Sequence, residues 1–490
     1  MTFFINLYIF VQDLNSPLRL VVRTPGFHPG NRSSTLLGDV NMYKPYIKPV
    51  ETAFPDVKIP PPRVSKFYIF IVSILVKPYF FMLFGMAKIF LRGEAFVFDA
   101  FKRALSKKSR CIIAFRHPDG REPQLLASFF LFKLKALAAK SKIRFDRNPH
   151  AIFVYGYEVV RWGGALPRIF MPNLGAIPIH HTKIDSKGME RIYGSILDGQ
   201  YPIALAPEGQ VSYSMDSLPR LEQGSIRIGF QAASQMAGKN MDCPLEILPL
   251  SVHYRYGRGG KAAMEKLLKR LEKFCGFSKR DTKSLSFTER LCKCRDFILQ
   301  INESRYSLKS DASLTFDQRL QRVVNSALET AERLLGFKSE GDFFPRLYKV
   351  RHDCWDRIFL PGTDSLEKVP YVKRAVMDLG AGEAWHISRH QELADFGWYF
   401  HHPLPTEETA LHQKIEYVQN LWDFANRTMG GALSGRVNIP VKRIFIKGAP
   451  VINLSERLGR YKEDKRAAVA EAVSDLEKAF LGCIEEMSKE

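Results

Sequence analysis

Residues 110–124 read R-C-I-I-A-F-R-H-P-D-G-R-E-P-Q, and this stretch decides how the rest of the chain is interpreted. Its first six residues have the length and apolar character of a buried strand. The turn-rich segment that follows holds His117 and, five positions later, Glu122; Asp119 is a second carboxylate nearer in sequence. A neutral imidazole can accept a proton near pH 7, and a carboxylate can orient it. Because rigid strands position reactive loops, we expect a site at the end of this strand.

Apolar runs alternate with helical patterns around this stretch, over residues 93–258. The predicted strands are residues 110–115, 151–155, 176–179, 202–206 and 246–252, and the predicted helices are residues 123–139, 187–197 and 224–237. This alternation is typical of an α/β domain. Pro249 lies inside the last predicted strand. Because proline cannot donate a hydrogen bond to a neighbouring strand, it indicates an edge strand or a shaped pocket wall.

The most hydrophobic segment, residues 67–92, precedes the α/β domain. Its length approaches the roughly 20 residues of a membrane span, but Lys77 and Pro78 interrupt it near the middle. Two pieces of about ten residues each are too short to cross a bilayer singly. We predict a membrane-dipping helical hairpin or kinked helix in one leaflet, with lysines reaching the headgroups. A buried pair of core helices and a single kinked span are the alternatives.

Three other regions of the chain flank the apolar segment and the α/β domain. Residues 1–66 form a leader rich in proline, which excludes long helices. Its first eleven residues lack the basic start and cleavage site of a signal peptide. Residues 259–435 are largely helical and charged, and their role is open. Residues 436–452 predict a pair of strands, one of them at 441–447, and residues 462–487 predict a long amphipathic helix. We expect this unit, residues 436–490, to pack back onto the α/β domain.

The chain of 490 residues has a net charge of +21, which indicates an anionic partner such as a nucleic acid, an anionic bilayer or a phosphorylated metabolite. Nucleic acid is not expected, because no module that binds it is recognisable. The seven scattered cysteines indicate a reducing compartment without a disulfide framework. Neither Cys292 and Cys294 nor the pair His386 and His390 has the further ligands of a metal site, so no metal is expected.

Three more segments carry polar residues at strand ends. Residues 174–183 read L-G-A-I-P-I-H-H-T-K, where a glycine turn and a short strand lead to a basic end with His181 and Lys183. Another predicted strand stops at P-E-G, residues 207–209. The last segment is the apolar strand that contains Pro249. All three follow the His117 loop in the chain.

In this order, across about residues 110–255, the four segments resemble the motif blocks of the glycerolipid acyltransferase family, whose members acylate glycerol-3-phosphate or lysophospholipids. His117 matches the histidine of the first block, H-x-x-x-x-D, and Glu122 stands where the family has aspartate. Residues 175–183 resemble the glycine-strand-basic second block. Glu208, within P-E-G, matches the third block, and Pro249 matches the fourth.

The resemblance implies an acyltransferase-like mixed sheet flanked by helices and a direct transfer reaction. His117 would remove the proton from a glycerol hydroxyl, and Glu122 would orient His117 and stabilise its charged form. The alkoxide would then attack the thioester of acyl-CoA or of acyl carrier protein, an acidic protein partner. No acyl-enzyme is expected, and no cofactor beyond this co-substrate.

The resemblance also implies residues that bind substrate. Paired cations suit the phosphate of the acceptor, and the candidates are Arg116, Arg121, Lys183 and His181, the last standing where the family has an arginine. Glu208, with Gly209 beside it, would accept a hydrogen bond from an acceptor hydroxyl or anchor a phosphate-binding arginine. Pro249 would shape the wall of the pocket.

We therefore predict a membrane-associated acyltransferase of phospholipid synthesis that faces the cytoplasm and binds membrane lipid and an acyl thioester. The first acceptor is 1-acylglycerol-3-phosphate, and glycerol-3-phosphate or another lysolipid comes next. A catalytically inactive relative that binds lipid is the second possibility, since Glu122, Gln210 and Val211 depart from the family's pattern. A basic nucleic-acid-binding protein is the third and is suggested by charge alone.

Overall fold

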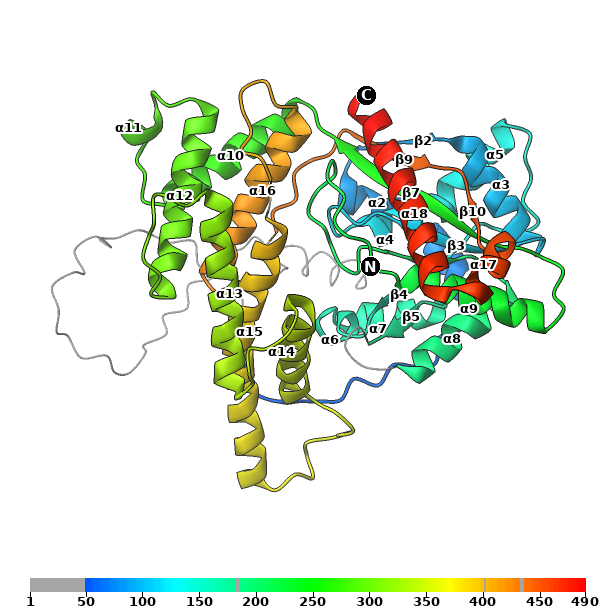
Figure 1. The fold of residues 1–490 in the computed structure, drawn as a ribbon, viewed down its shortest axis with the longest axis horizontal. Coiled ribbons are helices and arrows are strands. Elements are labelled where there is room, and N and C mark those ends of the chain that lie inside the picture. The colour runs from blue at the N-terminus through cyan, green and yellow to red at the C-terminus, as the bar shows by residue number, and fades with distance from the viewer. Residues whose placement is uncertain (1–48, 181–184, 401, 432–435) are drawn as a thin grey trace.

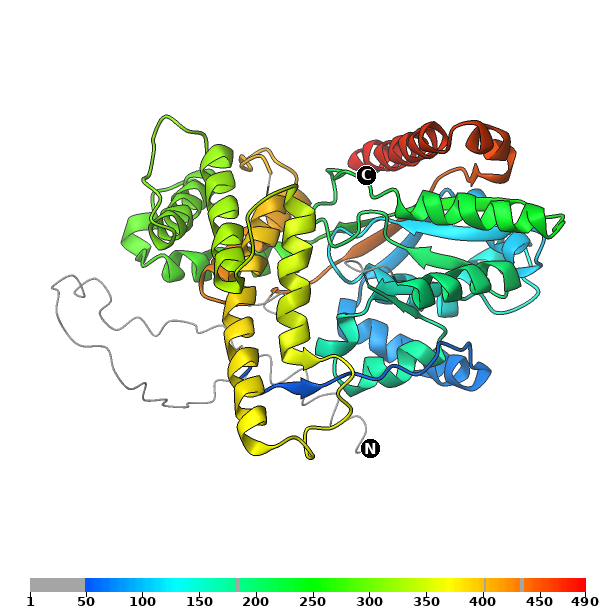
Figure 2. The same ribbon diagram turned by 60° about the horizontal axis from the view of Figure 1, so that its bottom comes forward.

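The structure, a computed structural model, describes residues 49–180, 185–400, 402–431 and 436–490 (Figure 1). Most of the predicted leader lies outside these residues. The described chain forms a mixed α/β domain and a group of helices beside it (Figures 1 and 2). The mixed α/β architecture expected from the sequence is confirmed.

The main sheet has eight strands, seven of them in the order β2-β9-β7-β3-β6-β4-β5, and β10 also pairs with β7. The strands are β2 (Lys88–Arg92), β3 (Arg110–Phe115), β4 (Ile152–Gly156), β5 (Ile177–Ile179), β6 (Ile203–Leu205), β7 (Leu245–Arg255), β9 (Arg443–Gly448) and β10 (Ile452–Asn453). From β7 to β5 all neighbours are parallel, whereas β9 and β10 run antiparallel to β7. The carboxyl ends of β3, β6, β4 and β5 therefore share one edge of the sheet.

Helices cover both faces of this sheet. Alternate residues of β3 divide between two cores, with Ile113 in one and Ile112 in the other, as the period of a strand requires. The first core is closed by α2 (Lys66–Phe84), α3 (Glu94–Leu105), and α4 (Glu122–Phe129), which continues through a π-helical turn (Phe130–Leu134) into α5 (Lys135–Lys140). The second core is closed by α8 (Ser186–Asp198), α9 (Gly224–Gly238) and α18 (Lys465–Ser488), which follows the short α17 (Leu458–Glu463).

The predicted apolar hairpin is wrong. Residues 66–84 form one helix, α2, which contains Pro78 and ends at Gly85, where φ is +59°. The rest of the apolar segment is β2, which pairs in parallel with β9. Within the described residues, α2 is the one helix long and apolar enough to cross a membrane. A local pattern could not reveal β2, because its partner lies more than 300 residues further along the chain.

The group of helices lies between β7 and β9 in the sequence and has its own hydrophobic core. Its helices are α10 (Arg258–Phe274), α11 (Lys279–Thr282), α12 (Phe287–Arg305), α13 (Phe316–Leu335), α14 (Phe343–Ile358), α15 (Tyr371–Tyr399) and α16 (Leu411–Thr428). Capping boxes at Ser286 and Thr315 start α12 and α13. A two-stranded sheet, β1 (Phe54–Pro55) with β8 (Phe359–Leu360), joins the start of the described chain to this group. We call residues 258–428 the helical insertion.

The end of the chain completes the main sheet. The strands β9 and β10 do not pair with each other as predicted; both pair with β7. The expectation that Pro249 marks an edge strand is also wrong, because β7 lies between β3 and β9. The partner of β7 changes from β10 to β9 between Ile247 and Leu250. The carbonyl of Pro249 faces this side, accepting from the Ala449 amide at 3.2 Å, so the missing N–H falls at the interruption.

Candidate active site

His117 follows the carboxyl end of β3, and its side chain pairs with Glu122. The distance from His117 Nδ1 to Glu122 Oε2 is 2.6 Å. Glu122 is fully buried, and the His117 side chain is 15% exposed. A carboxylate at Nδ1 favours the tautomer in which Nδ1 carries the proton. The other ring nitrogen, Nε2, is then free to act as a base.

Glu122 is held by several donors besides His117. Its Oε2 accepts from the Gly120 amide at 2.9 Å, and its Oε1 accepts from the Tyr254 hydroxyl at 2.7 Å. Glu122 is also the first residue of α4, where the helix dipole favours a negative charge. These contacts fix the orientation of the carboxylate, so the longer glutamate side chain is held against the imidazole.

Tyr254 was missed in the sequence. It lies on β7, two residues beyond the end of the predicted strand, and its partner Glu122 lies 132 positions away. The alternation of buried residues along β7, continued to Val252 and Tyr254, points both side chains into the same core. A hydroxyl on that face of the strand is the signal that could have revealed it.

The protonation of His117 reflects opposing effects. Burial lowers the pKa of His117, but the hydrogen bond and charge of Glu122, with the charges of Glu208 and Asp119, outweigh burial and raise the pKa above its ordinary value. A carboxylate that stabilises the imidazolium form makes the imidazole a stronger base. The site is therefore arranged to take up a proton at His117.

Glu208 and Arg116 form a buried pair that supports the loop. Glu208 Oε2 accepts from the His117 amide at 2.9 Å, and Arg116 Nε donates to Glu208 Oε1 at 3.2 Å. The other Arg116 donors bind the carbonyls of Ser214, Met215 and Ser217. Arg116 is fully buried, so it does not present a donor to a phosphate, and that expectation is corrected. Glu208 was expected to anchor a phosphate-binding arginine. It does anchor an arginine, Arg116, but Arg116 supports the loop and is not exposed to a phosphate.

Gly209 closes the turn after β6. Its φ is +74°, a conformation that favours glycine, and its amide donates to the Ala206 carbonyl at 3.1 Å. The turn places Glu208 beneath the His117 backbone. Pro249, the remaining residue expected at the substrate, is buried in the sheet opposite Ala114 of β3. It therefore lies within the sheet rather than on an open pocket wall.

Arg121 joins the loop to the end of α2. Its guanidinium lies 5.0 Å from the centre of the Phe84 ring, and its Nη1 donates to the Leu83 carbonyl at 3.3 Å. Its Nε pairs with Asp119 at 2.5 Å. Asp119 is therefore engaged with Arg121, and its carboxylate does not take the orienting place that Glu122 occupies beside His117.

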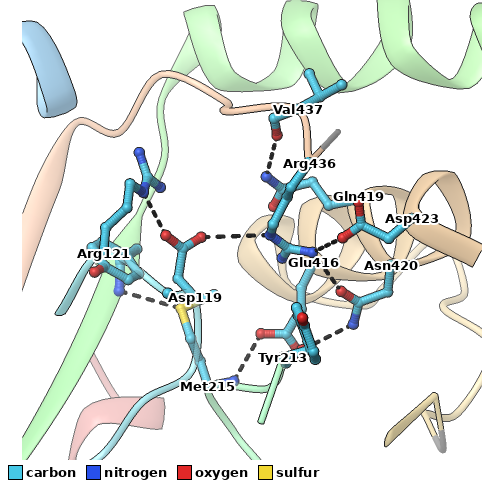
Figure 3. A network of polar contacts seen from close by, with 12 residues as sticks. Asp119, Arg121, Tyr213, Met215, Glu416, Gln419, Asn420, Asp423, Arg436 and Val437 are labelled. Carbon is cyan, nitrogen blue, oxygen red and sulfur yellow. Dashed lines mark hydrogen bonds and ion pairs between the residues drawn. The ribbon is translucent and has the colours of Figure 1, made fainter. Parts of the chain in front are cut away.

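Helix α16 of the helical insertion also contacts this loop (Figure 3). Arg436 lies between Asp119, 4.0 Å from its Nε, and Asp423 of α16, which it contacts through Nη1. Glu416 accepts from the Met215 amide at 2.8 Å, and Asn420 donates to the Tyr213 carbonyl at 2.9 Å. The insertion therefore supports both the His117 loop and the segment after the P-E-G turn.

The second motif block is only partly described. His181 and Lys183 lie outside the described residues, so their expected role stays a prediction. His180, at the end of β5, stacks on Tyr157 with ring centres 4.4 Å apart. A pocket at the carboxyl ends of β4 and β5 is lined by Tyr157, Glu158, Arg161, His180, Arg351, His352 and Trp355. The two arginines in this lining, Arg161 of α6 (Val159–Trp162) and Arg351 of α14, are not among the cations predicted from the sequence.

In the described part of the chain, no three His, Cys, Asp or Glu side chains are grouped so as to hold a metal ion. His390 instead contacts the Tyr306 hydroxyl at 2.8 Å. All seven cysteines are within the described residues and are free thiols. Comparisons with models of known protein families and with curated proteins find no match for this chain.

Proposed function

We propose that this protein is a membrane-associated glycerolipid O-acyltransferase that uses His117 as its general base. The observation that carries the proposal is the 2.6 Å contact between His117 Nδ1 and the buried carboxylate of Glu122. The order of the four motif blocks supports the same reaction class. Since the carboxyl ends of β3, β6 and β5 share one sheet edge, the described residues of the first three blocks lie along that edge.

In the proposed reaction, His117 Nε2 takes the proton from the acceptor hydroxyl as its oxygen attacks the thioester carbonyl. A C–O bond forms, and the tetrahedral intermediate then expels the thiolate as the C–S bond breaks. The imidazolium returns its proton to the thiolate, which regenerates the neutral base. General-base assistance of this kind contributes about 10²–10⁴-fold to the rate.

The acceptor proposed first is 1-acylglycerol-3-phosphate, with glycerol-3-phosphate and other lysolipids next, and the donor is acyl-CoA or acyl carrier protein. The exposed apolar side chains of α2 support an acceptor that is reached from a membrane. Arg121 supports this as well, because it contacts both the end of α2 and the His117 loop. The proposed location is the cytoplasmic face of a membrane.

The test is acyl transfer from acyl-CoA to 1-acylglycerol-3-phosphate in mixed micelles, followed by thiol release. His117→Ala and Glu122→Gln should each lose most of the activity while keeping the wild-type circular dichroism spectrum. Matched controls are His386→Ala and Glu94→Gln, which change exposed residues away from the site and should retain activity. Activity that survives His117→Ala would contradict the mechanism.

An inactive lipid-binding relative remains the second candidate because Gln210 and Val211 depart from the third block of the family. Gln210 donates to Asp395 of α15 at 2.9 Å, so it is engaged with the insertion instead of open to a substrate. If the wild-type chain transfers no acyl group to 1-acylglycerol-3-phosphate, glycerol-3-phosphate or other lysolipids, but binds a lysolipid saturably, this second function is favoured.

A further inference from the structure

Helix α2 presents a large apolar face to solvent. Phe67 is 65% exposed, and the large hydrophobic side chains exposed along the same helix are Phe67, Phe70, Ile74, Tyr79, Phe81 and Met82. Four other residues turn inward, namely Ile69, Val76, Phe80 and Phe84. The helix is therefore packed on the α/β domain along one side only. Exposed apolar patches of this kind mark interaction surfaces.

Both ends of α2 are fixed to the same domain. Before its first turn, the Ser65 amide donates to the Asn173 carbonyl at 2.9 Å. At its last turn, Arg121 donates to the Leu83 carbonyl, and the chain enters the main sheet at β2 four residues after the helix ends. A helix of 19 residues is about 28 Å long. It cannot cross a bilayer while both of its ends stay on one domain, so it must lie along the domain surface.

A second helix, α7 (Ala165–Asn173), contacts the start of α2. The Tyr68 and Phe170 rings meet edge to face, with centres 5.7 Å apart. Beyond this junction, α7 exposes Leu166 and Ile169, the latter 48% exposed. The surface that we call the α2–α7 face consists of the exposed residues of α2 together with these two.

The charged residues of helices α2 and α7 have one sign, since they are Lys66, Lys77 and Arg168, with no Asp or Glu. Residues 57–93 also contain no Asp or Glu, although Lys58 and Arg92 pair with Asp364 and Glu490 from other parts of the chain. Residues 159–180 likewise include two arginines and no acidic residue. An apolar face with only cations among its charged residues fits the headgroup and acyl boundary of an anionic leaflet.

We propose that the α2–α7 face is a monotopic membrane-binding surface, in which α2 lies flat in one anionic leaflet and α7 inserts beside it. The proposal deepens the membrane association that is part of the proposed function, and it does not depend on the acyl-transfer reaction. Because Arg121 contacts both the end of α2 and the His117 loop, this placement brings the loop to the level of the headgroups.

The role of α7 is tested by flotation of the full-length protein with vesicles of phosphatidylcholine and phosphatidylglycerol. Ile169→Asp should weaken binding about tenfold or more, since it replaces an aliphatic side chain that inserts into the leaflet with a charged one. Phe70→Asp should do the same for α2. The matched control is Leu334→Asp, which changes a residue of the insertion with a similar exposure and should bind as the wild type does.

Unchanged binding of Ile169→Asp together with weakened binding of Phe70→Asp would exclude α7 from the surface. Unchanged binding of both would overturn the whole proposal and indicate that a protein segment covers this face. Quenching of fluorophores placed at positions 70, 74 and 81 measures depth. Equal, shallow depths are expected for a flat helix, whereas depths graded across the bilayer would overturn the monotopic arrangement.

The two proposals can fail separately. His117→Ala should bind vesicles as the wild type does, because its surface is unchanged. Ile169→Asp should retain transfer to a water-soluble short-chain acceptor but lose transfer to an acceptor held in vesicles. Vesicle binding without any acyl transfer in the wild type would leave the α2–α7 face standing and remove the proposed reaction alone.

Discussion

At the scale of single residues, His117 is the group whose titration should govern the rate. Burial lowers its pKa, and Glu122, Glu208 and Asp119 raise it by a larger amount. Since the base must be neutral to act, kcat/KM should rise with pH through a midpoint above about 6.5, the ordinary value for histidine. Glu122→Gln removes the main raising charge, so its midpoint should fall as its maximum rate falls. A rate profile of each variant checks this, and identical midpoints would contradict it.

Tyr254 is expected to position Glu122. Its hydroxyl donates to Glu122 Oε1 at 2.7 Å in the interior of the domain, so Tyr254→Phe leaves that oxygen without this donor. We expect a loss of about tenfold in kcat, with a much smaller change in KM, because the substrate does not contact the tyrosine. Tyr193→Phe is the control, as that hydroxyl binds Gln231 on the helices of the opposite face. Equal kcat values for the two variants would remove this role.

At the scale of elements, α16 is tied to the His117 loop by Arg436. This arginine, whose side chain is 12% exposed, lies between the buried carboxylates of Asp423 and Asp119. Arg436→Met leaves both carboxylates without it, and breaking a buried pair in this way costs about 3–5 kcal/mol. Urea denaturation should show the loss, and adding Asp423→Asn should recover part of it because one unpaired charge is removed. An unchanged denaturation midpoint for Arg436→Met would show that the contact carries no stability.

Glu416, also on α16, should make stability depend on pH. Burial raises its pKa from 4.5 to about 8, against the lowering effect of the Met215 amide. Between these two values the folded chain holds a proton that the unfolded chain has released, so stability falls as pH rises from about 4.5 to about 8. Below this window Glu416 causes no loss of stability, and above it the loss stays constant. Glu416→Gln should lack the decline, as free energies of unfolding at several pH values would reveal; parallel curves would refute it.

At the scale of the whole molecule, the last 55 residues are part of the α/β domain. Strand β9 lies between β2 and β7, and α18 packs Phe480 and Leu476 into the core beneath β3 and β7. A chain that ends at residue 435 loses both, which leaves β2 without its partner. We expect this truncated chain to aggregate and to lack a cooperative thermal transition, as measured by circular dichroism. A folded, active truncation would show that the unit is dispensable.

The helical insertion gives the molecule a third hydrophobic core, besides the two on the faces of the main sheet, while remaining connected to the site. It follows β7 and precedes β9 in the chain, so its two ends connect to strands that are neighbours in the sheet. Through Glu416 and Asn420 it contacts the loop that follows β6, and through Asp423 it contacts Arg436, which in turn contacts Asp119 in the loop after β3. A change in the insertion can therefore alter the site without touching a substrate.

The sequence by itself determined the elements whose signals are local. The alternation of apolar runs and helical patterns located β3 to β7 together with α4, α5, α8 and α9, because side-chain periodicity is set by near neighbours, but it did not predict α6 and α7. The pairing of His117 with Glu122 was predictable for the same reason, since they are five positions apart in one turn-rich segment. The predicted helix at residues 123–139 corresponds to α4, the π-helical turn and α5.

Only the tertiary structure decided the features that depend on distant parts of the chain. The pairing of β2 with β9 made the last five residues of the apolar segment a strand, and the change of partner along β7 accommodated Pro249 in a central strand. Packing likewise buried Arg116 against Glu208, 92 positions away, and brought Tyr254 to Glu122. Whether a charged residue is buried, or a segment pairs as a strand, depends on partners that are distant in the sequence, and no local pattern encodes those partners.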